Sequence, residues 1–155
     1  MDLICKITDK DIGENYSELE NPRIRLAARG IVIRDDGKIA IFNKSNKNEY
    51  KLPGGGIEDD ENPEEAFKRE CLEETGCTLK DLKYLCCHNP SNGMSDLKLH
   101  VFGAKVATES MEIDTNEVNA KKWIPKEQVI EILRNNDTQC GVSMLALLYA
   151  IQFYL

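Results

Sequence analysis

Three glutamates between positions 70 and 74 form a dense group of side chains that could do chemistry. Glu70, Glu73 and Glu74 are spaced i, i+3 and i+4, so a helix, which turns by about 100° per residue, would place all three carboxylates on one face. Carboxylates crowded in this way repel one another unless a cation neutralises them. Because carboxylate and carbonyl oxygens are the ligands that Mg²⁺ accepts, the cluster predicts a divalent-cation site. The alternative is a solvated acidic helix face.

A longer pattern of fixed spacing surrounds this cluster. From Gly55 the sequence reads GGIEDDENPEEAFKRECLEETGC. It matches G-x5-E-x7-R-E-U-x-E-E-x-G-U, where U is usually a bulky aliphatic residue, and the segment therefore resembles the box of the Nudix hydrolases. The fixed positions of the pattern are all present: Gly55, Glu61, Arg69, Glu70, Glu73, Glu74 and Gly76. Cys71 and Cys77 occupy the U positions, and because cysteine packs as a small hydrophobe, we expect the chemistry to be undisturbed.

The resemblance implies a set of metal ligands. By the family pattern, the backbone carbonyl of Gly55 and the carboxylates of Glu70, Glu73 and Glu74 bind Mg²⁺, for which Mn²⁺ can substitute. Some family members take a further ligand or base from a loop outside the box. Glu117 lies in such a downstream segment, where the alternative is an ordinary solvated residue.

Two other charged residues of the box receive supporting roles. Arg69 cannot lose its proton and presents a planar fork, so we expect it to hold Glu61 or Glu73 in place. The metal would polarise the bridging phosphates and lower the pKa of a bound water that attacks phosphorus. A carboxylate must take the proton of that water, and Glu70 is the expected general base.

The resemblance also implies an activity, the magnesium-dependent hydrolysis of a phosphoanhydride bond in a nucleoside diphosphate derivative. The proline that marks ADP-ribose hydrolases after the box is not in place, because Pro90 comes too early. The tyrosine that marks dinucleoside polyphosphate hydrolases is also not in place, since residues 93–95 are Gly, Met and Ser. By elimination, a MutT-like (deoxy)nucleoside triphosphate pyrophosphohydrolase, of the kind that includes enzymes for oxidised dNTPs, is the leading expectation. The alternatives are an ADP-ribose or nucleotide-sugar pyrophosphatase and, from another class, a non-catalytic nucleotide-sensing module.

Residues outside the box could hold the nucleotide. Arg25 and Arg29 lie in alternation on an expected strand, where their guanidinium groups could meet phosphates. Tyr50 could stack on a base, and Phe102 and Trp123 are further candidates for stacking. The alternative is that the arginines form the wet face of a strand and that the aromatic residues belong to the core.

The elements before the box are expected to be strands. Residues 23–34 and 38–42 are apolar runs separated by Asp36 and Gly37, which is the sequence signal of a β-hairpin. Pro53 and the three glycines that follow it predict a loop with exposed backbone groups.

The box then continues into a helix. Asn62 can cap its N-terminus, Pro63 suits the first helical position and Gly76 supplies the stop, which predicts a helix over residues 63–75. Further strands are expected at residues 83–87 and 97–106, which should pair, and at 121–124; helices are expected at 125–133 and 142–155. We therefore expect a single domain over residues 1–155, an α/β (α+β) fold with a mixed central sheet flanked by helices, the Nudix-like α/β/α sandwich.

The net charge and the longest apolar run limit the kinds of partner that the sequence predicts. The formal net charge of -7 argues against a nucleic-acid polymer, which would need a basic face, and leaves a small nucleotide as the expected partner. The run 142–155 is shorter than the about 20 residues of a membrane span. It predicts a buried helix rather than a membrane partner, and the alternative is a dimer-forming helix and hence a homodimer.

Cysteine usage indicates the compartment. The chain has 6 cysteines and no secretory signal at its N-terminus, so we expect a reduced, cytoplasmic protein. Cys86 and Cys87 precede His88, but no second pair of ligands is spaced for zinc, and buried thiols are the favoured interpretation.

Overall fold

The described residues form one mixed sheet of seven strands with three helices packed on it. The computed structural model describes residues 25–44, 49–93, 95–110 and 121–155. The elements are, in chain order, β1 (Leu26–Ile33), β2 (Ile39–Lys44), β3 (Glu49–Lys51), β4 (Gly54–Gly56), α1 (Pro63–Thr75), β5 (Cys77–His88), β6 (Lys98–Glu109), β7 (Lys121–Ile124), α2 (Lys126–Arg134) and α3 (Gly141–Phe153).

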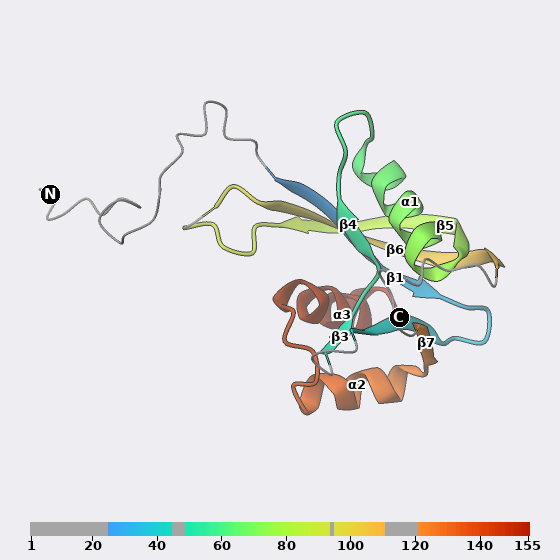
Figure 1. Cartoon of the computed structure of the whole chain (residues 1–155). Coiled ribbons are helices and arrows are strands. Elements are labelled where there is room, and N and C mark those ends of the chain that lie inside the picture. Colours follow the sequence, from blue (N-terminus) through green and yellow to red (C-terminus); the bar gives the residue numbers. More distant parts are fainter. Residues whose placement is uncertain (1–24, 45–48, 94, 111–120) are drawn as a thin grey trace, which may run out of the picture.

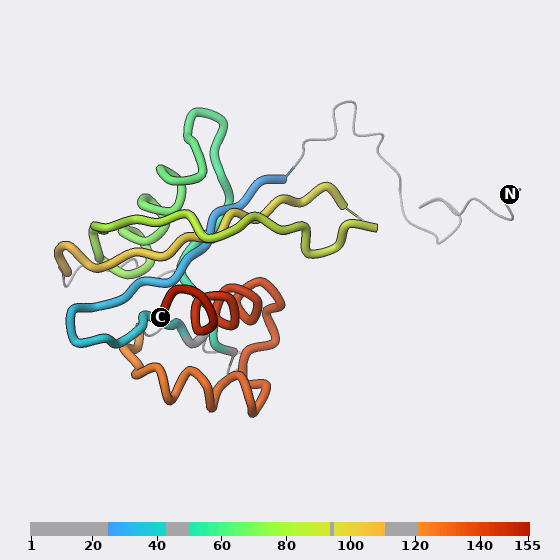
Figure 2. Tube along the Cα trace, turned by 180° about the vertical axis from the view of Figure 1, so that it is seen from behind, coloured from blue at the N-terminus to red at the C-terminus, as the bar shows by residue number. Residues whose placement is uncertain are grey.

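The sheet has the order β3-β2-β1-β6-β5, with β4 paired to β1 and β7 paired to β2. β1 and β6 run parallel, with Ala28 opposite His100, and the other pairs are antiparallel. Helix α1 covers one face, and α2 and α3 lie on the other (Figures 1 and 2). The expected α/β/α sandwich with a mixed sheet is confirmed.

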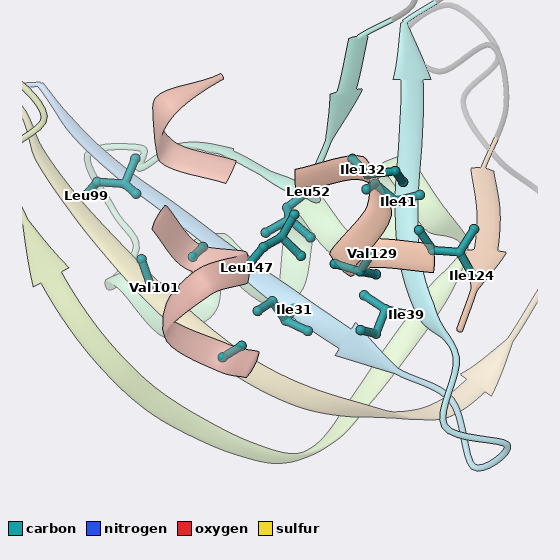
Figure 3. Packing of buried hydrophobic residues seen from close by; sticks show 12 residues of the cluster. Ile31, Ile39, Ile41, Leu52, Leu99, Val101, Ile124, Val129, Ile132 and Leu147 are labelled. Carbon is teal, nitrogen blue, oxygen red and sulfur yellow. The ribbon is translucent and has the colours of Figure 1, made fainter. Parts of the chain in front are cut away.

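Each face of the sheet has its own hydrophobic core. Between the sheet and helices α2 and α3, Ile31 and Ile41 pack with Val129 and Leu147 (Figure 3). On the α1 side, Phe67 stacks on Phe102 with ring centroids 5.5 Å apart. Because burial of each such side chain stabilises the fold by about 1.5–3 kcal/mol, the two cores fix α1 and α3 on opposite faces.

The predicted hairpin is confirmed, and one predicted strand is too short. Gly37 has φ +80° in the turn, and Ile33 pairs with Ile39. β5, expected over residues 83–87, already begins at Cys77 and pairs with β6 along its length. The polar segment around Asp81, which has φ +51°, hides the strand in the sequence, because the pairing there passes through an irregularity between Lys80 and Lys83.

The glycines after Pro53 form strand β4, where the sequence predicts a loop. Gly54, Gly55 and Gly56 pair with β1, and a Cβ on Gly54 would lie 2.2 Å from the Ala28 carbonyl oxygen. Gly54 also has φ +130°. Glycine is therefore needed here for a close backbone approach, and the backbone groups are paired in the sheet rather than exposed.

Helix α3 is apolar on two faces. Ala146, Leu147 and Ala150 are buried against the sheet, as the sequence predicts. The outer face exposes 53% of Leu148 and 69% of Phe153 and borders a groove of about 390 Å³ lined by Gly141, Met144, Leu145, Leu148, Tyr149 and Phe153. The dimer-forming helix stays a prediction. In the described part of the chain, no helix is long and apolar enough to cross a bilayer.

Candidate metal and catalytic site

Local interactions fix the ends of α1. The Asn62 side chain accepts hydrogen bonds from the Glu64 and Glu65 backbone N–H groups, each at 3.0 Å, and Glu65 accepts one from the Asn62 backbone N–H at 2.9 Å. This capping box satisfies groups that a helix start leaves unpaired. Gly76 ends the helix with φ +67°. The predicted bounds are confirmed.

One face of α1 is buried and the other carries the carboxylates. Ala66, Phe67, Cys71 and Thr75 pack against the sheet. Glu70 lies at the edge of this buried face, and its carboxylate occupies the space beside Gly55, where a Cβ would be 2.4 Å from Glu70 Oε1. Gly55 is thus a glycine because the carboxylate needs this place.

A second carboxylate contacts the same strand. Glu74 Oε2 accepts a hydrogen bond from the Gly54 N–H at 2.8 Å. Glu70 and Glu74, one helical turn apart, therefore flank consecutive residues of β4 and lie close to the Gly55 backbone. Glu73 lies farther out, with 51% of its side chain exposed.

This donor set fits a hard cation. Carboxylates and a backbone carbonyl are oxygen ligands of the kind Mg²⁺ binds, and the glycine beside Glu70 leaves room for them. Within the described ranges, no three acidic, histidine or cysteine side chains converge on one point in the arrangement seen here. The residue types at β4 and α1 match the chemistry of a hard cation.

Arg69 joins the box residues. Its Nε and Nη2 donate to the two carboxylate oxygens of Glu61 at 3.1 Å and 2.7 Å. Its Nη1 donates to Glu70 at 3.0 Å and to Glu73 at 3.1 Å. Its Nη2 also donates to the Gly56 carbonyl at 3.1 Å. The planar fork engages both carboxylates that the sequence offered as alternatives.

These contacts shift the ionisation of the pair. The hydrogen bonds from Arg69 are the main reason that the pKa of Glu61 is lowered, against the effect of desolvation. The pKa of Arg69 is raised in turn, chiefly by Glu61. Both groups are therefore charged at neutral pH, and Glu61 is held as an ionised partner of Arg69.

The residues considered for nucleotide binding have different surroundings. Arg25 is exposed. Arg29 donates from Nη1 to the Leu52 carbonyl, and Tyr50 is half-buried against the core on the α3 side. Phe102 is only 3% exposed, so stacking of a base on this ring is wrong as an expectation. Burial against Phe67 explains its aromatic character.

Trp123 and Glu117 are the remaining candidates from the sequence. Trp123 donates from Nε1 to Glu109 at 2.9 Å and lies 5.1 Å from the Arg34 guanidinium, so its ring is engaged within the protein. Glu117 lies outside the described residues. Its proposed part in metal binding stays a prediction.

The described cysteines differ in burial, and Cys86 and Cys140 are intermediate. Cys71 and Cys77, at the aliphatic positions of the box, are fully buried, and desolvation raises the pKa of Cys71 to about 12. Cys87 is exposed, so the expectation of buried thiols is wrong for this residue: alternation along β5 turns its side chain outward.

One residue that contacts the site was absent from the sequence expectations. Lys121 Nζ donates to the Thr75 carbonyl at 2.6 Å. The last turn of α1 has no basic residue, and this is a sequence signal that a cation must come from elsewhere. The signal does not say from which residue, because the partner is 46 positions away.

Comparison with known proteins now identifies the family. A model of the NUDIX domain matches residues 23–146. The chain belongs to the Nudix family. The expected membership of the Nudix hydrolase family, drawn from the box, is confirmed.

The chain is similar to several named proteins. The chain is similar to a CMP-5'-(N-acetyl-N-hydroxy-3-aminopropyl)phosphonate hydrolase of Streptomyces rubellomurinus (30% identity, 64% of this chain, 48% of the relative). It is also similar to a MutT-like protein of Streptomyces ambofaciens (31%, 71% and 70%) and to an ADP-ribose pyrophosphatase of Bacillus subtilis (28%, 79% and 68%). The matched region thus spans about half of the first relative's length.

A solved structure has the same fold. A NUDIX hydrolase from Nitrosomonas europaea superposes with a TM-score of 0.67 at 17% sequence identity, covering 84% of this chain and 90% of the other. At this identity the likeness concerns the fold alone, the α/β/α sandwich. Nudix enzymes generally act with divalent metal cations, in agreement with the oxygen donors at β4 and α1.

Proposed function

We propose that the chain is a magnesium-dependent pyrophosphohydrolase that cleaves a phosphoanhydride bond in a nucleoside diphosphate derivative. The observation that carries the proposal is the contact of two carboxylates with one strand: Glu70 fills the space beside Gly55, and Glu74 binds the Gly54 N–H. The carboxylates of a solvated acidic helix face would point into water and would not contact a glycine backbone. The same carboxylates belong to a complete box.

The metal would be held by the Gly55 carbonyl and by Glu70, Glu73 and Glu74, with Glu117 as a further candidate ligand. Mg²⁺ is the proposed ion, and Mn²⁺ can replace it, since both accept hard oxygen ligands. When bound, the ion supplies charge neutralisation at the bridging phosphates and a water of lowered pKa.

Glu70 is the proposed general base. Its carboxylate is largely shielded, with 14% of the side chain exposed, and it lies beside the backbone of Gly55. From this place it can accept the proton of the attacking water. Arg69 orients Glu70 by a hydrogen bond at 3.0 Å and holds Glu61 through its fork, so we assign Arg69 and Glu61 to keeping the catalytic carboxylate in position.

A (deoxy)nucleoside triphosphate, including an oxidised one, is the leading substrate, and the MutT-like relative supports it. ADP-ribose or a nucleotide sugar is the alternative, supported by the ADP-ribose pyrophosphatase relative. Arg25 and Arg29 are the proposed contacts to phosphate, and Tyr50 is the proposed contact to the base. The net charge of -7 favours a small nucleotide over a nucleic-acid polymer.

Two properties of the whole protein complete the proposal. We propose a homodimer through the outer face of α3, because this face exposes Leu148 and Phe153 and no charged residue lies between Gly141 and Leu155. A two-fold contact would set this face against its own copy and bury these side chains without repulsion between like charges. We also propose a reducing, cytoplasmic setting, in keeping with the exposed thiol of Cys87.

The activity can be tested with a substrate panel. The protein is incubated with Mg²⁺ and nucleoside triphosphates, oxidised dGTP, ADP-ribose, nucleotide sugars or dinucleoside polyphosphates, and released phosphate is measured with and without an added phosphatase. Turnover that EDTA abolishes and Mg²⁺ restores is the expected result. Binding of a nucleotide without turnover of any panel member would instead support the sensing module.

The base assignment needs variants. Glu70→Gln should abolish turnover with little change in nucleotide binding. Glu64→Gln is the matched control, because Glu64 lies on the same helix with its side chain exposed and paired with Lys68 at 2.6 Å. Full activity in Glu70→Gln would exclude Glu70 as the base.

A further inference from the structure

The C-terminal end of α1 carries negatively charged side chains, which destabilise this end of the helix. Glu73 and Glu74 lie in the last turn of α1, which has no basic residue of its own. The carbonyl groups at a helix C-terminus carry partial negative charge, so acidic side chains there destabilise the helix unless a cation is near. The helix that carries the metal-site carboxylates therefore depends on a cation from another element.

Lys121, the first residue of β7, provides that cation. Its Nζ donates to the Thr75 carbonyl and to Glu109 Oε1, both at 2.6 Å, and only 9% of the side chain is exposed. Trp123 Nε1 donates to the same Glu109 oxygen at 2.9 Å. One ammonium group thus ties the end of α1 to β6 and β7.

This anchor lies next to the site. Thr75 directly follows Glu74, whose carboxylate is bound to the Gly54 N–H at 2.8 Å. In the middle of the helix, Arg69 donates to the Gly56 carbonyl at 3.1 Å. Helix α1 is therefore fastened beside β4 by Arg69 on one side and by Lys121 at its end.

We propose that Lys121, which lies outside the box, is a positioning residue of the metal site. By binding the Thr75 carbonyl, Lys121 fixes the rotation of α1 about its own axis and its position along β4. These two quantities decide how Glu70, Glu73 and Glu74 face β4. The inference rests on the proposed function, since it takes these glutamates to be the metal ligands. The hydrogen bonds of Lys121 go to Thr75, Cys77 and Glu109 rather than to these glutamates.

The direction of a change in metal affinity separates positioning from simple electrostatics. If Lys121 acted only through its charge, removing it would leave the site more negative and would strengthen cation binding. If it positions the ligands, removing it loosens the end of α1 and weakens cation binding. The two effects have opposite signs.

The test measures Mn²⁺ binding without substrate, from the electron paramagnetic resonance signal of free Mn²⁺. Lys121→Met should weaken Mn²⁺ binding by about 10-fold, as loss of a group that orients metal ligands commonly does. Lys121→Arg, which keeps the charge and the donors, should stay within about threefold of the wild type. Unchanged or tighter binding in Lys121→Met would overturn the inference.

Lys122→Met is the matched control. It removes the same charge from the same strand, but Lys122 is exposed and its Nζ lies 5.9 Å from the Tyr50 ring. Binding in this variant should stay within about twofold of the wild type. A loss equal to that in Lys121→Met would mean that the weaker binding does not depend on the Thr75 contact, which also overturns the inference.

A milder variant covers the case in which Lys121→Met does not fold, which circular dichroism would reveal. Glu109→Gln weakens the hold on Lys121, and Mn²⁺ binding should fall by about threefold relative to Glu64→Gln, which removes one negative charge from α1 at a residue paired with Lys68. Equal affinities in these two variants would count against the inference. If the wild type itself binds no Mn²⁺, the proposed metal site fails and the role of Lys121 falls with it. Strong wild-type binding that is insensitive to Lys121 overturns the positioning role alone.

Discussion

The Glu70 carboxylate occupies the place where a side chain on residue 55 would begin, with Glu70 Oε1 2.4 Å from an ideal Cβ on Gly55. Gly55→Ala should therefore displace this carboxylate. Because the displaced group is the far end of a flexible side chain, stability should change by less than about 1 kcal/mol. Activity should fall by about 100-fold, as misplacement of a catalytic group by about 1 Å does.

Gly56→Ala is the control for this prediction. A Cβ on Gly56 would meet no atom within 4 Å, so steady-state activity and the urea midpoint should both stay near the wild-type values. Equal activity losses in the two variants would show that the β4 backbone, rather than the position of Glu70, limits the reaction.

The fork of Arg69 on Glu61 should be visible in the pH dependence of stability. Because the pKa of Glu61 is lower in the folded chain than in the unfolded chain, the pair stabilises the fold above the unfolded pKa of about 4.3 and loses this contribution as the pH falls through the lower, folded pKa. Urea unfolding of wild type and Glu61→Gln should show a gap at pH 7 that shrinks toward pH 3. A gap of constant size would contradict the assignment.

Arg69→Lys tests the geometry of the same contact. Lysine keeps the charge but cannot reproduce the two parallel hydrogen bonds to Glu61 at 3.1 Å and 2.7 Å. We expect a loss of about 1 kcal/mol in stability, because the partly exposed pair is screened by solvent, together with a larger loss of activity. Wild-type activity in this variant would show that charge alone is sufficient at position 69.

Thiol labelling should distinguish the exposed and buried cysteines. Cys87 is exposed and should react rapidly with DTNB, whereas Cys71 is fully buried with its pKa raised to about 12 and supplies little thiolate at pH 8. Cys87→Ser should remove one rapid equivalent from the native protein, and Cys71→Ser should remove none. Rapid loss of a Cys71 equivalent would mean that the α1 side of the core opens readily.

The outer face of α3 gives a test of the proposed homodimer. Leu148→Glu places a charge at the 53% exposed Leu148 and should convert a dimer into a monomer in light-scattering chromatography. Leu72→Glu is the control, because Leu72 on α1 is also 48% exposed but lies on the other side of the sheet. A wild type that elutes as a monomer at high micromolar concentration would exclude this dimer.

The sequence alone determined α1 and the carboxylates on it. Asn62, Pro63 and Gly76 define the ends of the helix through contacts within three residues of each end, and the spacing of Glu70, Glu73 and Glu74 follows from the helical period. The hairpin at Gly37 is equally local. These features could be predicted because interactions between near neighbours in the chain are sufficient to specify them.

The tertiary structure decided what those local elements contact. It turned the glycines at 54–56 into a strand on β1, placed Phe102 in the core and brought Lys121 to the end of α1. None of these contacts leaves a periodic signal in the sequence, because each joins residues more than 20 positions apart, as from Ala28 to Gly55 or from Thr75 to Lys121. They arise only when both faces of the sheet are buried together, since the packing of each core selects which distant segments meet.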